Sequence, residues 1–290
     1  MSELQLPEAI VSADWLHQHI DHPNLVIFDA SWHMPAANRD AFTEWKNEQI
    51  KNARFFDFDQ AISDPDSDLP HMMPDADLFT VEVQKLGLNH DSQVVVYDSL
   101  GMFSSPRVWW MLRAMGFNAC AVLDGGLPAW KSAGFETSRL AESVQIEPGN
   151  YIASQVDSKF CDSRAVLSAI SDNSTTVLDA RPAERFRGEV DEPRAGLRRG
   201  RMPGASNLPF PDLFADGLLK PSPELKAMFG ELIPAGNRAI CSCGSGVTAC
   251  IIALGAHLVG NDNVTVYDGS WCEWGQPDLF PVEQAQDLAD

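Results

Sequence analysis

The chain has 290 residues, which exceeds the usual size of one domain and favours two domains of roughly 100–150 residues. Hydrophobic residues make up 44% of the chain and aromatic residues 9%, a content that supports packed cores and excludes a disordered chain. The net charge of −20 opposes contact with nucleic acid phosphates and anionic membranes, so neither is an expected partner.

The first ten residues lack the basic segment and long apolar run of a secretory signal. No window approaches the roughly 20 apolar residues of a membrane helix, so we expect a soluble, cytoplasmic protein. In that compartment the six cysteines should be reduced. The close pair Cys241-Ser-Cys243 lacks the paired Cys-x2-Cys spacing of a zinc site, so no metal is predicted.

Predicted strands and helices alternate along each half of the chain. The first half predicts strands at 24–29, 94–98 and 121–124, with a helix at 106–116. The second half predicts strands at 176–179, 239–243 and 264–268, with a helix at 247–258. The ends of matching strands are separated by 150, 145 and 144 residues, and these ends are Asp29 and Asp179, Asp98 and Cys243, Asp124 and Asp268. Such nearly constant offsets indicate a duplicated unit.

The predicted strands are short, continuous apolar runs, which is typical of parallel sheets buried on both faces. The sequence therefore predicts two tandem α/β domains, each a parallel sheet with helices on both faces. A polar, turn-prone stretch around Pro148-Gly-Asn150 suggests a linker. We predict an N-terminal domain at 1–140, a linker at 141–157 and a C-terminal domain at 158–290.

The segment 181–201 forms a basic island in an acidic chain. Seven arginines against four acids give it a net charge of +3. Guanidinium groups bind carboxylates through two parallel hydrogen bonds, so a small carboxylate is a fitting ligand. Alternatively, these arginines pair with the interspersed acids, and we favour that interpretation for Arg187, Arg198, Arg199 and Arg201.

The loop Cys243-Gly-Ser-Gly-Val-Thr248 follows a predicted strand and opens a predicted helix. Its two glycines allow backbone N–H groups to turn inward, and the helix start adds partial positive charge. A cysteine at such a place should have a lowered pKa, and the same N–H donors would stabilise the anionic outer sulfur of a persulfide. A buried structural cysteine is the alternative.

This loop resembles the active-site loop of the 3-mercaptopyruvate sulfurtransferases of the rhodanese superfamily. The segments Ser105-Pro-Arg-Val-Trp-Trp-Met, Asp124-Gly-Gly and Glu192-Pro-Arg-Ala-Gly-Leu-Arg-Arg-Gly are also similar to that family, and the resemblance covers roughly residues 9–280. It implies a Cys243 persulfide formed from 3-mercaptopyruvate, with release of pyruvate and transfer of sulfur to cyanide or to a thiol such as thioredoxin. It implies no cofactor.

The resemblance also assigns site residues. Arg185 and Arg194 would bind the carboxylate and carbonyl of the substrate, beside the loop residues Gly244, Gly246, Val247 and Thr248. Asp59, His71 and Ser245 would form a proton relay, in which a carboxylate orients a histidine beside a serine. Asp98 stands where the second domain has its cysteine, so the first domain should be catalytically silent.

Three alternatives stay open. Thiosulfate:cyanide sulfur transfer is the nearest, although the neutral Gly244 and Ser245 suit the thiosulfate dianion poorly. A cysteine phosphatase requires Cys-x5-Arg, whereas position 249 is alanine. A sulfur carrier without turnover is the non-enzymatic alternative. Cys120, Cys161, Cys250 and Cys272 are interpreted as small core or surface residues.

Overall fold

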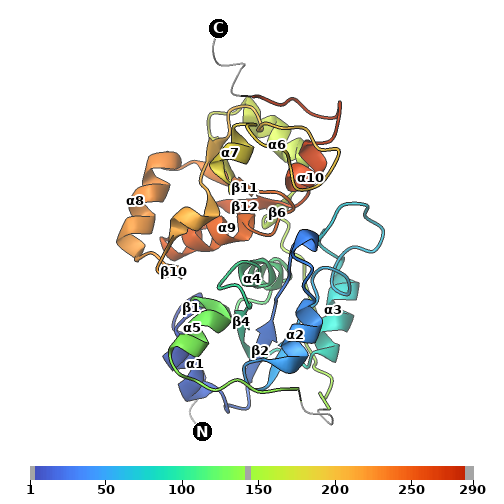
Figure 1. Ribbon diagram of the computed structural model, residues 1–290, viewed down its shortest axis with the longest axis vertical. Coiled ribbons are helices and arrows are strands. Elements are labelled where there is room, and N and C mark those ends of the chain that lie inside the picture. The colour runs from blue at the N-terminus through green and yellow to red at the C-terminus, as the bar shows by residue number, and fades with distance from the viewer. Residues whose placement is uncertain (1–3, 141–144, 285–290) are drawn as a thin grey trace. The chain divides into compact units, whose positions relative to one another are not determined.

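The computed structural model describes residues 4–140 and 145–284. The chain divides into two compact units (Figure 1). Unit 1 comprises Met1–Pro65, Met73–Val156 and Asp216–Leu219, and unit 2 comprises Asp66–Met72, Asp157–Ala215 and Lys220–Asp290. Each unit thus includes a short segment from the other half of the sequence. Nothing in the local hydrophobic pattern predicts these two exchanged segments.

Unit 1 is built around a five-stranded parallel sheet in the order β1-β5-β4-β2-β3. Its strands are β1 (Ile10–Val11), β2 (Leu25–Asp29), β3 (Ala53–Phe55), β4 (Gln93–Tyr97) and β5 (Cys120–Leu123). Its helices are α1 (Ala13–His19), η1 (Pro35–Ala37), α2 (Ala41–Asn47), α3 (Ala76–Lys85), α4 (Ser105–Ala114) and α5 (Gly126–Ser132).

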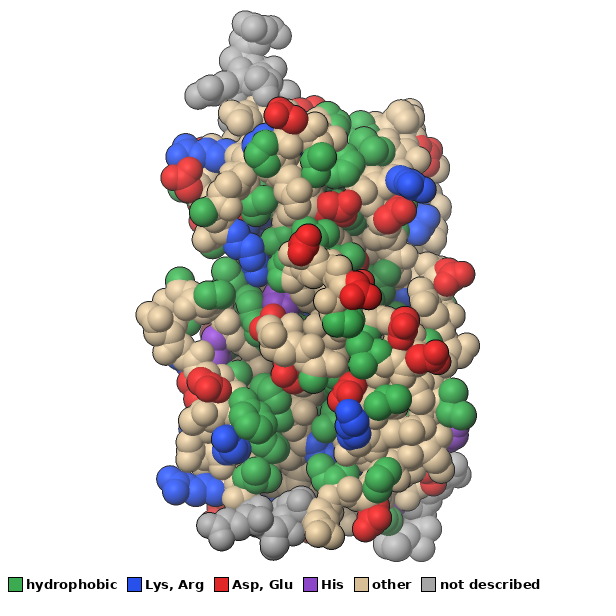
Figure 2. All heavy atoms as spheres, turned by 90° about the vertical axis from the view of Figure 1, so that its right-hand side faces the viewer, with side chains coloured by type: hydrophobic (Ala, Val, Ile, Leu, Met, Phe, Trp, Pro, Cys, Tyr) green, Lys and Arg blue, Asp and Glu red, His purple; other side chains and the backbone are tan. Residues whose placement is uncertain are grey.

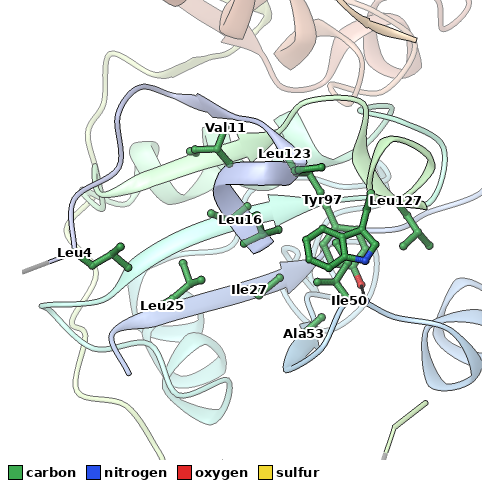
Figure 3. Close-up of a cluster of buried hydrophobic side chains, with 14 residues drawn as sticks. Leu4, Val11, Leu16, Leu25, Ile27, Ile50, Ala53, Tyr97, Leu123 and Leu127 are labelled. Carbon is green, nitrogen blue, oxygen red and sulfur yellow. Dashed lines mark hydrogen bonds between the residues drawn. The ribbon is translucent and has the colours of Figure 1, made fainter. Parts of the chain in front are cut away.

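Side chains alternate across the unit 1 sheet, and helices cover both faces. On one face, Ile27, Val95 and Leu123 pack with Leu16 of α1 and Trp130 of α5 in one buried cluster (Figure 3). On the other face, α4 packs against β4 and β5, and nine of its ten residues are buried. Burial on both faces explains why the central strands are apolar throughout.

Unit 2 repeats this architecture, with the parallel strand order β6-β12-β11-β7-β8. Its strands are β6 (Phe160–Cys161), β7 (Thr175–Asp179), β8 (Ser206–Asn207), β11 (Arg238–Ser242) and β12 (Val264–Tyr267). Its helices are α6 (Ser163–Ile170), α7 (Ala183–Phe186), η2 (Phe210–Leu213), α8 (Ser222–Leu232), α9 (Ala249–Leu258) and α10 (Ser270–Trp274). The short strand β9 (Phe214–Ala215) also belongs to unit 2, and the short strand β10 (Leu218–Leu219) belongs to the segment of unit 1 that follows it.

Helices also cover both faces of the unit 2 sheet. Ile240 and Tyr267 pack on one side with Val166 of α6 and Trp271 and Trp274 of α10. Helix α9 packs against β11 and β12, and its residues from Ala249 to Ala256 are all buried. This helix is apolar all round because neighbouring elements enclose it, as expected for a core helix.

The predicted fold class of two tandem parallel α/β domains is confirmed. The domain boundaries stay a prediction, and residues 141–144 of the predicted linker lie outside the described residues. The part of that linker from 145 to 156 lies along unit 1, where Tyr151 donates a hydrogen bond from its hydroxyl to the Met115 carbonyl at 2.6 Å.

Figure 2 shows acidic side chains distributed over one face, with fewer basic side chains among them, in keeping with the net charge of −20. Among the described helices, none has the length and apolar character needed to cross a membrane.

Candidate active site

The loop that begins with Cys243 lies directly after β11, an inner strand of the unit 2 sheet between β12 and β7. Helix α9 begins six residues later at Ala249. The loop therefore lies at the carboxyl end of a parallel strand, where α/β proteins bind ligands. Gly246 adopts a φ of 73°, a conformation that glycine reaches without steric cost. The predicted strand–loop–helix arrangement is thus present.

The start of α10 fixes the first two residues of the loop. The Trp271 amide donates to the Cys243 carbonyl at 3.0 Å, and the Cys272 amide donates to the Gly244 carbonyl at 2.8 Å. The Cys243 amide donates to the Ser270 hydroxyl oxygen at 3.2 Å, and that hydroxyl donates to the Tyr267 carbonyl at 2.8 Å. These bonds hold the backbone on which the Cys243 sulfur is carried.

The following amides of the loop remain available. Within the described part of the chain, the N–H groups of Gly244, Ser245, Val247 and Thr248 donate no hydrogen bond to another protein group. Cys243 is 2% exposed and Ser245 is 6% exposed, whereas Gly244 and Thr248 are half-buried. A cluster of enclosed, unengaged N–H donors is suited to an anion, because an unpaired buried donor otherwise costs free energy.

Unit 1 offers an internal comparison at the matching position, where Asp98 follows β4. One carboxylate oxygen of Asp98 accepts hydrogen bonds from the Ser104 amide, the Ser105 amide and the Ser105 hydroxyl at 3.0, 2.8 and 2.7 Å. The other oxygen accepts from the Leu100 amide at 2.9 Å. In unit 1 the loop thus encloses an acidic side chain, and the same place in unit 2 carries a sulfur.

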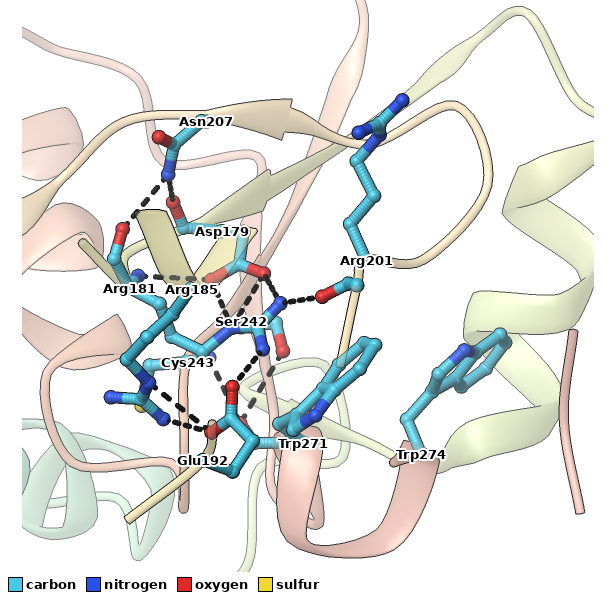
Figure 4. Close-up of polar contacts among 12 residues, drawn as sticks. Asp179, Arg181, Arg185, Glu192, Arg201, Asn207, Ser242, Cys243, Trp271 and Trp274 are labelled. Atoms are coloured by element: carbon cyan, nitrogen blue, oxygen red, sulfur yellow. Dashed lines mark hydrogen bonds and ion pairs between the residues drawn. The ribbon is translucent and has the colours of Figure 1, made fainter. Parts of the chain in front are cut away.

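Arg185 reaches the loop from α7. Its Nη2 atom lies 3.3 Å from the position that a Cβ atom on Gly244 would occupy, and its side chain is 19% exposed. Figure 4 shows the guanidinium beside Cys243. Glu192 accepts hydrogen bonds from Nε and Nη2 of Arg185 through one carboxylate oxygen. Arg185 therefore brings a positive charge to the loop from a fixed direction.

A buried chain of charges holds Glu192 in turn. Its second oxygen accepts a hydrogen bond from Arg181 at 2.8 Å, and Arg181 also bonds Asp179 at 2.7 Å. The Arg181 guanidinium lies 3.9 Å from the centre of the Trp271 ring, and it donates to the Gly200 carbonyl at 2.8 Å. Arg181 is 1% exposed, so its charge is compensated by two carboxylates in the interior.

A family model for the rhodanese-like domain matches residues 12–133 and 163–277. The chain is 42% identical over 276 residues to a 3-mercaptopyruvate sulfurtransferase of Escherichia coli, covering 94% of this chain and 97% of that protein. The chain belongs to the rhodanese family. It is also 39% identical to a mitochondrial thiosulfate/3-mercaptopyruvate sulfurtransferase of Arabidopsis thaliana, covering 98% of this chain and 80% of that protein.

A crystal structure of a 3-mercaptopyruvate sulfurtransferase from Escherichia coli superposes on this rhodanese with a TM-score of 0.82 at 40% identity. The match covers 91% of this chain and 98% of that one. The similarity therefore extends through both units and is not confined to the loop.

The other arginines of the basic island differ in their partners. The predicted pairing with interspersed acids is confirmed for Arg187, which contacts Glu189, and for Arg199, which contacts Asp191. It is wrong for Arg198, which donates to the carbonyls of Trp274 and Phe280, and for Arg201, which pairs with Glu283. These two arginines bind residues about 80 positions away, so local charge spacing could not predict their partners.

Arg194 is half-buried, and its charge acts on the same cysteine as that of Arg185. Both guanidiniums lower the pKa of Cys272, although burial, the largest effect, raises that pKa to about 11. Arg185 and Arg194, the two arginines predicted to bind the substrate, therefore both lie close enough to Cys272 to act on its thiol. The roles of Arg181 and Glu192 in holding Arg185 were not predicted from the sequence. Their position in the same basic island, 181–201, could have suggested these contacts.

The relay residues are divided between the units. Asp59 lies in unit 1, whereas His71 and Ser245 lie in unit 2. Asp59 lies within an Asx turn, in which the Asp57 carboxylate accepts hydrogen bonds from the amides of Asp59 and Gln60 at 3.2 and 2.9 Å. His71 is 2% exposed and has a φ of 64°. The relay itself stays a prediction.

Among residues 4–140 and 145–284, no three His, Cys, Asp or Glu side chains are arranged to hold a metal ion.

Proposed function

We propose that this rhodanese is a 3-mercaptopyruvate sulfurtransferase that carries sulfur as a persulfide on Cys243. The observation that carries the proposal is the loop itself: a cysteine begins a set of enclosed, unengaged amides beside Arg185. The unit 1 loop supports it, because the same position there stabilises the Asp98 carboxylate through three amides and a hydroxyl. Relatives that carry this activity in their names span nearly the whole chain.

The proposed first step is attack of the Cys243 thiolate on the sulfur of 3-mercaptopyruvate. The new S–S bond forms as the C–S bond breaks. The electron pair of the C–S bond stays on carbon, so pyruvate leaves as its enolate. The enolate carbon takes up the proton of the transferred thiol, which gives pyruvate and an anionic enzyme persulfide. The amides of Gly244, Ser245, Val247 and Thr248 would stabilise the outer sulfur, as an oxyanion hole stabilises oxygen.

In this proposal Arg185 and Arg194 bind the keto acid. A guanidinium binds a carboxylate through two hydrogen bonds and also stabilises charge that develops on the carbonyl oxygen during C–S cleavage. Glu192 fixes the orientation of Arg185 and leaves one of its terminal nitrogens for the substrate. Asp59, His71 and Ser245 would transfer protons between the substrate and solvent.

In the second step, cyanide, a small thiol or a thioredoxin-type dithiol would accept the outer sulfur and regenerate Cys243. The chemistry needs no metal or organic cofactor, since both steps are nucleophilic displacements at sulfur. The cytoplasm stays the predicted location.

Thiosulfate is the second candidate donor. It is a dianion, and a cationic loop would favour it, whereas positions 244 and 245 are neutral glycine and serine. Steady-state turnover should therefore be faster on 3-mercaptopyruvate than on thiosulfate, and Cys243→Ser should abolish turnover on both. Full activity of Cys243→Ser would refute the proposed function, and a preference for thiosulfate would refute the donor assignment.

A further inference from the structure

Cys272 lies beside the loop in the first turn of α10. Its amide donates to the Gly244 carbonyl at 2.8 Å, while the preceding Trp271 amide donates to the Cys243 carbonyl at 3.0 Å. The segments 243–244 and 271–272 therefore run alongside each other at hydrogen-bonding distance. Cys272 is 6% exposed and Cys243 is 2% exposed, so the two cysteines share one enclosed environment.

The charges around Cys272 are those of the candidate site. Burial raises the pKa of the Cys272 thiol to about 11, and the nearby Cys243 and Glu192 also raise it. The guanidiniums of Arg194 and Arg185 lower the same pKa. Cys272 is thus close enough to feel both the sulfur that would carry the persulfide and the two arginines that would bind the substrate.

The other cysteines near the loop are placed differently. Cys250 is fully buried in α9, and its thiol donates to the Gly246 carbonyl at 3.3 Å. Cys241 is fully buried in β11, and burial with Cys250, Cys161 and Cys243 nearby raises its pKa well above the ordinary value. The charges that shift the pKa of Cys120, Cys161 and Cys241 include neither Arg185 nor Arg194, whereas those that shift the pKa of Cys272 include both.

We propose that Cys272 is a resolving thiol that releases sulfide from the Cys243 persulfide when no external acceptor is present. This inference rests on the proposed function, because it requires the persulfide. The Cys272 sulfur attacks the inner sulfur of the persulfide, a Cys243–Cys272 disulfide forms, and the S–S bond to the outer sulfur breaks. Cys272 attacks as the thiolate, after its proton has passed to solvent. The outer sulfur leaves with that electron pair and takes a proton from water, so the product is HS⁻. A dithiol reductant then restores both thiols.

The environment of Cys272 makes this a slow reaction that external acceptors outcompete. Near neutral pH the buried thiol is almost entirely protonated, and only the thiolate attacks a disulfide-type bond. The fraction of thiolate rises about tenfold per pH unit below the pKa, so sulfide release should accelerate by about that factor. Proximity to Cys243 compensates in part for the scarcity of the thiolate.

The test loads the full-length protein with 3-mercaptopyruvate, removes the donor, and follows the protein at pH 7, 8 and 9 without acceptor. Samples are alkylated and analysed by mass spectrometry, and free sulfide is assayed. In the wild type we expect the added sulfur on Cys243 to disappear and a Cys243–Cys272 disulfide to appear. About one equivalent of sulfide should be released, and the rate of all three changes should rise with pH. Dithiothreitol should restore loading.

Two variants and a matched control separate a chemical role from a structural one. Cys272→Ser and Cys272→Ala should both load and then retain the persulfide, with no disulfide and no rise in sulfide with pH. Cys250→Ser, another buried cysteine beside the loop, should behave as the wild type. Equal persulfide lifetimes in the wild type and both Cys272 variants would overturn this inference and leave the proposed function intact. Failure of the wild type to load any sulfur on Cys243 would overturn both.

Discussion

At the residue scale, the chemistry depends on how a few charged side chains are held around one sulfur. Arg185 is held by Glu192, which is held by Arg181, which is neutralised by Asp179. The Cys243 loop and the importance of Arg185 could be predicted from the sequence. The cysteine suggests a nucleophile, the glycines suggest inward-facing amides, and the arginine suggests a carboxylate-binding group. The supporting network could not, since Arg181 and Glu192 are 11 residues apart and meet only after the chain has folded.

Replacing Arg185 tests its role in substrate binding. Arg185→Ala should lower kcat/KM for 3-mercaptopyruvate by about a hundredfold, because a charge-assisted, two-bond contact with the carboxylate is lost. Arg185→Lys should recover only part of that loss, since an ammonium group cannot form the planar two-bond contact. Steady-state kinetics measure both.

Arg187 provides the matched control for that experiment. It is an arginine of the same helix end, exposed and paired with Glu189. Arg187→Ala should leave kcat/KM within about twofold of the wild type, as expected for an exposed ion pair. Equal losses in the Arg185 and Arg187 variants would mean that the island acts only through its total charge.

The Cys272 position shows a different limit of sequence reasoning. Cys272 was interpreted as a small filler because nothing adjacent in sequence marks it. The structure places it next to Gly244 through a backbone hydrogen bond across 28 residues. The proximity of Cys272 to the loop could have been predicted from the parallel strand order. Residues that follow β12 lie at the same edge of the sheet as residues that follow β11.

At the element scale, the duplicated strand–loop–helix places an aspartate after β4 and a cysteine after β11, so only the second loop offers a nucleophile. The inner strands β2, β4, β5, β7, β11 and β12 follow the predicted apolar runs closely. The edge strands β1, β3, β6 and β8 were not predicted, because each contains only two or three residues and forms no continuous apolar run. Strand β3 ends at Phe55, so Asp57 and Asp59 lie in the turn that follows it.

Asp98 should therefore be structural, and removing its charge should destabilise unit 1. We expect Asp98→Asn to lower the free energy of unfolding by about 1–3 kcal/mol, since Asn replaces an acceptor oxygen with a donor that faces buried amides. Thermal or urea unfolding of the variant measures this. Asp14→Asn, at an exposed position in the first turn of α1, is the control and should change stability by less than about 0.5 kcal/mol.

The same variant distinguishes a structural from a catalytic Asp98. Where unit 1 stays folded, Asp98→Asn should form the Cys243 persulfide as readily as the wild type. A variant of unchanged stability that no longer transfers sulfur would contradict the view that this loop is silent.

At the scale of the whole molecule, the two units share a fold but bury different charges. Asp179 in unit 2 pairs with Arg181, whereas the matching residues of unit 1 are Asp29 and Ser31. Asp29 is 1% exposed, and burial raises its pKa from 3.8 to about 6, opposed by hydrogen bonds from Ser31 and Tyr97. The overall acidic charge gave no indication of this difference, which depends on one missing arginine.

This raised pKa makes the stability of unit 1 depend on pH. The folded state binds the Asp29 proton more tightly than the unfolded state, so the contribution is complete below pH 3.8 and is lost as the pH rises through about 6. A shift of that size corresponds to about 2–3 kcal/mol. The difference in unfolding free energy between Asp29→Asn and the wild type should therefore grow by that amount between pH 4 and pH 7.

The measurement is the unfolding transition of each protein across that pH range, with the two units followed separately because two domains need not unfold in one step. Parallel pH profiles of the wild type and Asp29→Asn would contradict the assignment of this titration to Asp29.

We propose that the unengaged backbone amides of the Cys243 loop stabilise the anionic outer sulfur of a persulfide on Cys243. The most direct measurement is mass spectrometry of the protein after exposure to 3-mercaptopyruvate without acceptor, followed by peptide mapping. We expect one added sulfur atom on Cys243 and none in Cys243→Ser, even though Cys243 is only 2% exposed. Sulfur found on another cysteine, or no added sulfur on the wild type, would contradict it.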